Sequence, residues 1–175
     1  MPGCVVAYLV ITAILTGFEH MSFRRFVLAL LFSVAGWAAH AESNRVEFPA
    51  DLDKLVHYTT IRRGEVTEHI LTTSEALAAV KNGQPIPDGT HFVLVDYRDG
   101  KVYRYFVMQK GPGWGNDYDE VRRTADWQFQ WFWADESINM DENTARCQSC
   151  HTARAERNYL YTFDALGAFD GAAME

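Results

Sequence analysis

Residues 126–134 read DWQFQWFWA, and this stretch carries the clearest secondary-structure signal in the chain. Side chains alternate between the two faces of a β-strand, so a strand here gathers its large rings on one face and Gln128 and Gln130 on the other. The aromatic face consists of Trp127, Phe129, Trp131 and Trp133. We expect this face to pack as sheet core, with direct contact to a cofactor as the alternative.

Two hairpins are predicted upstream of this strand. β-rich runs at residues 57–63 and 65–72 flank Gly64, and runs at residues 90–97 and 101–110 flank a turn ending in Gly100. Glycine-containing turns between such runs are typical of antiparallel pairs. The sequence therefore predicts a mainly antiparallel sheet.

The remaining segments favour short helices and a loop. Thr72 and Glu75 have the spacing of a capping box, which predicts a helix through residue 81 with Gly83 at its end. Residues 111–125 are polar and glycine-rich, as in an ordered surface loop, and residues 147–170 are helix-prone. The expected fold class is α+β, mainly antiparallel β-sheet with a few short helices.

The first 41 residues read as a targeting leader. From Met21, two arginines are followed by an apolar run and by the small-residue signal Ala39-His40-Ala41, which is typical of a secretory signal peptide. The preceding apolar run, residues 5–18, is shorter than the roughly 20 residues of a spanning helix. We expect Met21 to be the true start and the mature protein to be periplasmic, with no membrane association after leader removal.

Residues 42–175 are expected to form a single domain. Removing the two arginines and one glutamate of the leader from 16 basic and 23 acidic residues leaves 14 and 22, a net charge of −8. A net charge of this sign makes nucleic acid and anionic lipid poor partners, and we expect neither to bind.

The two cysteines of this domain form the motif Cys147-Gln148-Ser149-Cys150-His151. Two thiols at this spacing can add to the two vinyl groups of a haem while the adjacent imidazole reaches the iron. The motif predicts one covalently attached haem c near the C-terminus, with Cys147 and Cys150 as attachment sites and His151 as an iron ligand. A thioredoxin-like redox motif, a zinc site and a local disulfide are the alternatives.

The other side of the iron decides between electron transfer and ligand binding. The candidate sixth ligands are Met108, Met140, His57, His69 and His91. Met108 is expected to be core filler and His91 a surface or edge residue, so no residue type here compels a closed site.

Several blocks of the sequence resemble the cytochrome P-460 family, which includes the cytochromes c′-beta. They are Pro87-Asp88-Gly89-Thr90, the strand ending Val107-Met108-Gln109-Lys110, Asp126-Trp127 and the tail from Cys147 to Phe163. The resemblance covers about residues 55–165 and implies a mainly antiparallel β fold, a five-coordinate haem on His151 and a homodimer.

The resemblance also bears on activity. Hydroxylamine-oxidising members carry a lysine cross-linked to the haem on the strand after the Asp-Gly turn, and the corresponding position here is Leu94, with Lys81 and Lys110 poorly placed as substitutes. Members without this lysine have an apolar distal pocket that admits nitric oxide or carbon monoxide. Phe92, Leu94, Phe106 and Met108 are expected to wall such a pocket.

The resulting hypothesis is an exported mono-haem cytochrome that binds nitric oxide or a similar gaseous or nitrogenous ligand. A hydroxylamine or nitric oxide oxidoreductase and a six-coordinate electron carrier with an unidentified redox partner are the alternatives. An enzyme would gain from a distal carboxylate, and Asp96, Asp141 and Glu142 are the candidates, each expected to be a solvated loop group.

Overall fold

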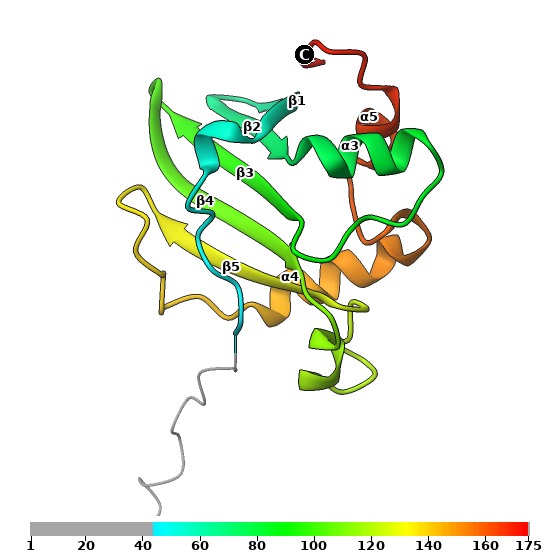
Figure 1. Cartoon of the computed structure of the whole chain (residues 1–175). Helices are drawn as coiled ribbons and strands as arrows, with labels where there is room; N and C mark the ends of the chain where they lie inside the picture. Colours follow the sequence, from blue (N-terminus) through cyan, green and yellow to red (C-terminus); the bar gives the residue numbers. More distant parts are fainter. Residues whose placement is uncertain (1–43, 175) are drawn as a thin grey trace, which may run out of the picture. The chain divides into compact units, whose positions relative to one another are not determined.

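Five antiparallel strands form one sheet in the order β1-β2-β3-β4-β5. The strands are β1 (Val56–Arg63), β2 (Val66–Thr72), β3 (His91–Arg98), β4 (Lys101–Lys110) and β5 (Trp127–Trp133) (Figure 1). Neighbours in the sequence are neighbours in the sheet, so no crossover connection is needed. Both predicted hairpins and the aromatic strand are confirmed to within about two residues at each end.

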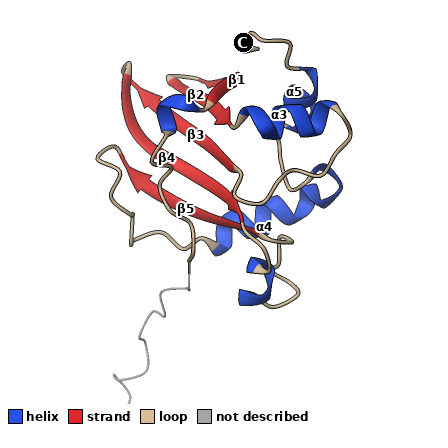
Figure 2. Ribbon diagram, in the orientation of Figure 1, coloured by secondary structure: helices blue, strands red, loops and turns tan. Residues whose placement is uncertain are grey.

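Short helices make up the other regular elements (Figure 2). The computed structural model describes residues 44–174, and the predicted leader, residues 1–41, lies outside them. No helix in the described part is long and apolar enough to cross a membrane. The predicted α+β class is confirmed by the sheet together with α3 (Ser74–Lys81), α4 (Ala145–His151), α5 (Phe163–Ala168) and the 3-10 turns η1 (Leu52–Lys54), η2 (Trp114–Asp117) and η3 (Thr152–Arg157).

The start of α3 differs from the prediction by one residue. Thr73 is the N-cap, and its side chain accepts a hydrogen bond from the Ala76 amide at 3.2 Å. Thr72 is instead the last residue of β2, fully buried, and its hydroxyl donates to the His91 carbonyl at 2.8 Å. The predicted capping box at Thr72 and Glu75 is therefore wrong, because the sheet holds Thr72.

We expect Thr73→Ala to lower the free energy of unfolding by about 1 kcal/mol, since one amide of the first turn loses its acceptor. Urea unfolding followed by circular dichroism measures the change. Ser74→Ala is the matched control, because the Ser74 hydroxyl bonds only the exposed Glu75 side chain. Equal unfolding midpoints for the two variants would contradict the assignment of Thr73 as the cap.

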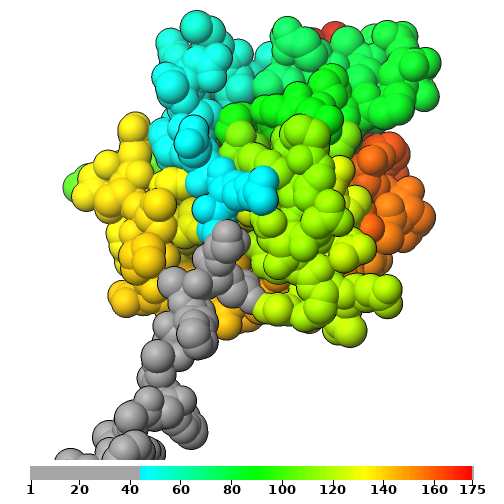
Figure 3. All heavy atoms as spheres, turned by 60° about the horizontal axis from the view of Figure 1, so that its bottom comes forward, coloured from blue at the N-terminus to red at the C-terminus, as the bar shows by residue number. Residues whose placement is uncertain are grey.

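One face of the sheet is covered by the N-terminal segment, residues 44–55. In the space-filling view this segment (cyan) lies against the chain that follows β4 (light green) (Figure 3). The Arg45 amide donates to Gln128 Oε1 at 2.9 Å, and Gln128 Nε2 donates to Asp117 Oδ2 at 2.7 Å. Gln128 is thus buried with its amide satisfied rather than solvated. The apolar residues buried on this face are Val46, Val93, Val95, Tyr105, Val107 and Phe132.

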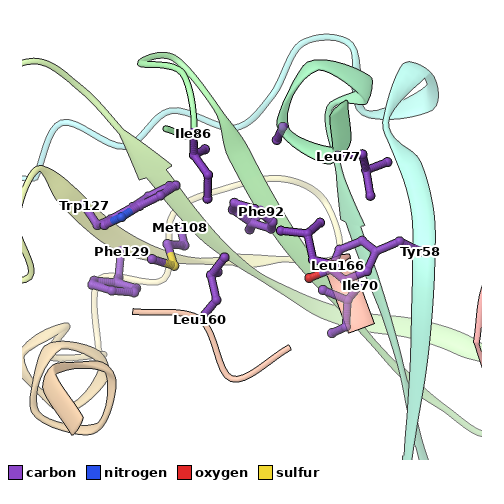
Figure 4. Close-up of a cluster of buried hydrophobic side chains, with 11 residues drawn as sticks. Tyr58, Ile70, Leu77, Ile86, Phe92, Met108, Trp127, Phe129, Leu160 and Leu166 are labelled. Atoms are coloured by element: carbon purple, nitrogen blue, oxygen red, sulfur yellow. The ribbon is translucent and has the colours of Figure 1, made fainter. Parts of the chain in front are cut away.

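The opposite face packs against the helices and the C-terminal segment. Its buried cluster draws on all five strands and includes Leu160 and Leu166 from the region after α4 (Figure 4). In Figure 4, Phe129 and Met108 lie on neighbouring strands, with Leu160 facing them from the C-terminal segment. This face carries the candidate site.

Candidate haem-binding site

Helix α4 presents the Cys-x-x-Cys-His motif to the sheet. Cys147 and Cys150 are free thiols, half-buried and exposed respectively, and His151 is half-buried. All three line a cavity of about 450 Å³ between α4, the sheet and residues 160–162. A cavity of this size is in the range of small-molecule and cofactor sites.

The sheet wall of the cavity is mainly apolar. Two rows of side chains cross the strands, each set by the register of the antiparallel pairs. Ile70, Leu94, Phe106 and Trp131 are successive partners in one row, and Phe92, Met108 and Phe129 are successive partners in the other. All seven line the cavity. The wall therefore offers a broad hydrophobic surface to a flat apolar ligand.

His151 is oriented for metal ligation. Its Nδ1 donates a hydrogen bond to the Tyr159 carbonyl, so the lone pair is on Nε2. The ring lies against Phe129 at 4.7 Å and against Tyr161 at 5.3 Å between centroids. Burial lowers the pKa of His151, although the Tyr159 carbonyl opposes this shift. A neutral imidazole with its other nitrogen anchored by a carbonyl is the usual state of a metal-bound histidine.

The carbonyl that orients His151 belongs to an unusual backbone turn. Asn158 and Tyr159 both have left-handed backbone conformations, with φ of 54° and 62°. Asparagine tolerates this region, whereas a tyrosine in it is strained. Strain of this kind concentrates at functional sites, and here it places the acceptor of the histidine hydrogen bond.

The alternatives to haem find little support in this geometry. Burial raises the pKa of the Cys147 thiol, whereas redox-active Cys-x-x-Cys motifs depend on a lowered thiol pKa. The motif also follows an antiparallel sheet rather than opening a βαβ unit. Among residues 44–174, no cluster of three or more histidine, cysteine or acidic side chains could hold a zinc ion.

Comparison with known families agrees with the site. The family model described as Cytochrome P460 matches residues 50–162, from before β1 to just past Tyr161. The chain belongs to the cytochrome P460 family. A haem with its iron is therefore the cofactor of this cytochrome. No curated protein matches the chain.

All seven residues predicted to contact the haem of this cytochrome line the one cavity. They come from α4 and from the paired strands β3 and β4, and they are Cys147, Cys150, His151, Phe92, Leu94, Phe106 and Met108. The aromatic strand β5 is only partly ordinary core, as Trp127 is buried but Phe129 and Trp131 line the cavity and Trp133 is 37% exposed. The core prediction is confirmed for Trp127 and Phe129, which are both buried in the cluster on this face, and it is wrong for the exposed Trp133. Phe129 and Trp131 also line the cavity, as the cofactor-contact alternative predicted.

Only one candidate sixth ligand lies in the cavity of the cytochrome. Met108 lines it and is 5% exposed. His57 and His69 stack on each other at 4.3 Å and do not line it. His91 alternates with Phe92 along β3, so its side chain is on the opposite face, and Met140 is 72% exposed.

No lysine lies among the cavity residues in the described part of the cytochrome. Leu94 occupies the cavity wall at the position where the family resemblance placed a cross-linking lysine. Lys110 is engaged elsewhere, because its Nζ donates to the Ile86 carbonyl at 2.7 Å and pairs with Asp88 at 3.1 Å.

The carboxylates differ from expectation. Asp96 was expected in a solvated loop, but it is 1% exposed in β3 and pairs with Arg104 at 2.8 Å and with Arg98 at 3.2 Å. That expectation is wrong, because arginines from β3 and the neighbouring β4 neutralise the charge. Asp141 and Glu142 do not line the cavity, whereas Glu68, not among the candidates, does.

The residues present fit a haem. The cavity combines an apolar wall, two free thiols and an imidazole with an available Nε2, which is the donor set of a c-type haem. When bound, the haem would supply one-electron chemistry and an iron centre for small ligands. The protein itself would supply the orientation of His151 and a mainly apolar wall beside the haem.

Proposed function

We propose that this cytochrome is exported to the periplasm, carries one haem attached through Cys147 and Cys150, and binds nitric oxide or a similar small ligand at the iron. His151 would be the protein's axial ligand, leaving the sixth position open. The observation that carries the proposal is the placement of the His151 ring at a cavity whose sheet wall is almost wholly apolar.

The apolar wall selects for neutral ligands. An unpaired charge placed among Leu94, Phe92 and Phe106 would lose its hydration without a compensating partner. A small uncharged molecule such as nitric oxide or carbon monoxide incurs no such cost. The chemistry of this wall therefore favours gas binding over binding of an ionic substrate.

The optical spectrum of the purified ferrous protein tests this function. We expect a high-spin spectrum that shifts when nitric oxide or carbon monoxide is added, because the proposed site leaves the sixth position open. A low-spin spectrum unaffected by either gas would overturn the proposal. Titration with each gas then provides the affinity.

Met108 is the observation that favours the second candidate, a six-coordinate electron carrier. Met108 lines the cavity, and a methionine thioether is a known haem ligand. Met108→Leu, which nearly conserves volume, separates the two functions. If the site is open, we expect the variant spectrum to be unchanged; if Met108 binds the iron, the variant spectrum becomes high-spin.

A hydroxylamine or nitric oxide oxidoreductase is less well supported, because no lysine of the described residues faces the cavity. Mass spectrometry of the haem peptide after proteolysis would detect any third covalent bond to the macrocycle.

Cell fractionation tests the periplasmic location, and sedimentation tests the homodimer that the family resemblance implies.

A further inference from the structure

An ionisable side chain, Glu68, lies at the edge of the apolar wall. Glu68 on β2 lines the cavity and is 8% exposed, yet its Oε2 accepts no hydrogen bond. Arg63 on β1 also lines the cavity, and its Nη2 lies 3.3 Å from this oxygen, an ion-pair contact without hydrogen-bond geometry. A nearly buried carboxyl oxygen with a free lone pair is costly unless a ligand completes its environment.

The attachment cysteines fix the direction in which a haem lies. A haem carries its two carboxylate groups on the edge opposite its two vinyl groups, so attachment through Cys147 and Cys150 directs the carboxylates away from α4. Helix α4 packs on β5, at one edge of the sheet, and Glu68 and Arg63 are on β2 and β1 at the other. Three strand spacings from β5 to β2 amount to about 14 Å, a distance that a haem lying along the wall can bridge.

We infer that Arg63 and Glu68 form the subsite for the haem carboxylates, with Arg63 as the pairing cation and Glu68 as a proton-sharing partner. This inference rests on the proposed covalent haem. Arginine has five N–H donors, so the contact with Glu68 leaves others free for a haem carboxylate. Burial raises the pKa of Glu68, which favours the protonated carboxyl that can donate a hydrogen bond to a carboxylate.

Charged groups from each neighbouring strand face Glu68. Arg63 on β1 and Arg104 on β4 lower its pKa, and Asp96, its partner on β3, raises it. Asp96 is itself held by Arg98 and Arg104. Arg146 on α4 lines the far side of the cavity. Glu68 is thus the carboxyl at the cavity wall, and Arg63 is the cation in contact with it.

The test is spectroelectrochemical titration of the holoprotein between pH 4 and 9. Each iron takes one electron from the mediated electrode, passing from ferric to ferrous, while Glu68 takes a proton from water. We expect the wild-type midpoint potential to fall as pH rises through the raised pKa of Glu68, because an ionised carboxylate favours the ferric state. Glu68→Gln should abolish that fall. Arg63→Gln should shift the potential downward, and Arg63→Lys should largely restore it.

Glu65→Gln is the matched control, because Glu65 is exposed in the β1–β2 turn and the change in charge is the same. Haem staining after denaturing electrophoresis is done first on every variant. Absence of covalent haem from the wild type would overturn the proposed function. Retained haem together with Glu68→Gln and Arg63→Gln profiles that match the Glu65→Gln profile would overturn the carboxylate subsite alone.

Discussion

Cys147→Ala/Cys150→Ala, produced with the export and haem-attachment machinery present, is expected to contain no covalently bound haem. Each thioether needs its own thiol, and the sequence from residue 42 onward holds no other cysteine. The single variant Cys150→Ala should retain at most one thioether and show weakened haem attachment. Haem staining after denaturing electrophoresis, followed by the pyridine haemochrome spectrum, measures the number of thioethers.

Ser149→Ala is the control for these variants. Ser149 lies between the two thiols on α4 and is exposed, so its replacement should leave haem attachment at the wild-type level. Normal covalent haem in Cys150→Ala would contradict the proposed c-type attachment. If Ser149→Ala lost as much covalent haem as the cysteine variants, any change in α4 would impair attachment. The cysteine variants would then give no evidence for thioether bonds.

The strands of this fold could be predicted because their signals are local. Alternation along residues 127–133 and glycine turns at Gly64 and Gly100 depend on near neighbours only. The start of α3 could not be fixed in this way, since Thr72 and Thr73 are both good caps. Hydrogen bonding of Thr72 to the His91 carbonyl, 19 residues later, decided between them.

The same distinction applies to the site. The cavity positions of Leu94 and Phe106 follow from strand alternation and hairpin register, both readable from the sequence. Asp96 is buried because it pairs with Arg104 on the neighbouring strand of the hairpin. The sequence around an ionisable residue in a strand does not indicate which residue it pairs with. Glu68 could have been found by applying the same alternation to β2, where it shares a face with Ile70. No pattern in the neighbouring sequence indicates that the Tyr159 carbonyl accepts a hydrogen bond from His151.

Asp96→Ala is expected to cause the largest loss of stability among single replacements of charged residues described here, about 3 to 5 kcal/mol. Asp96 is 1% exposed and accepts hydrogen bonds from Arg104 at 2.8 Å and from Arg98 at 3.2 Å. Arg104 also lies over the rings of Phe106 and Trp131 at 4.6 and 4.4 Å, so it would be left without its carboxylate against an apolar surface. Urea unfolding of the holoprotein at neutral pH measures the change.

Asp164→Ala provides the comparison, because Asp164 also pairs with an arginine but in solvent. Its contact with Arg157 is 2.6 Å long, yet the two side chains are 77% and 41% exposed. An exposed pair of this kind contributes about 1 kcal/mol or less. If the two variants lost similar free energies of unfolding, burial of the Asp96 carboxylate between its two arginines would not be the source of the stabilisation. A large loss confined to Asp96→Ala would show that the buried carboxylate and its arginines on β3 and β4 stabilise the fold.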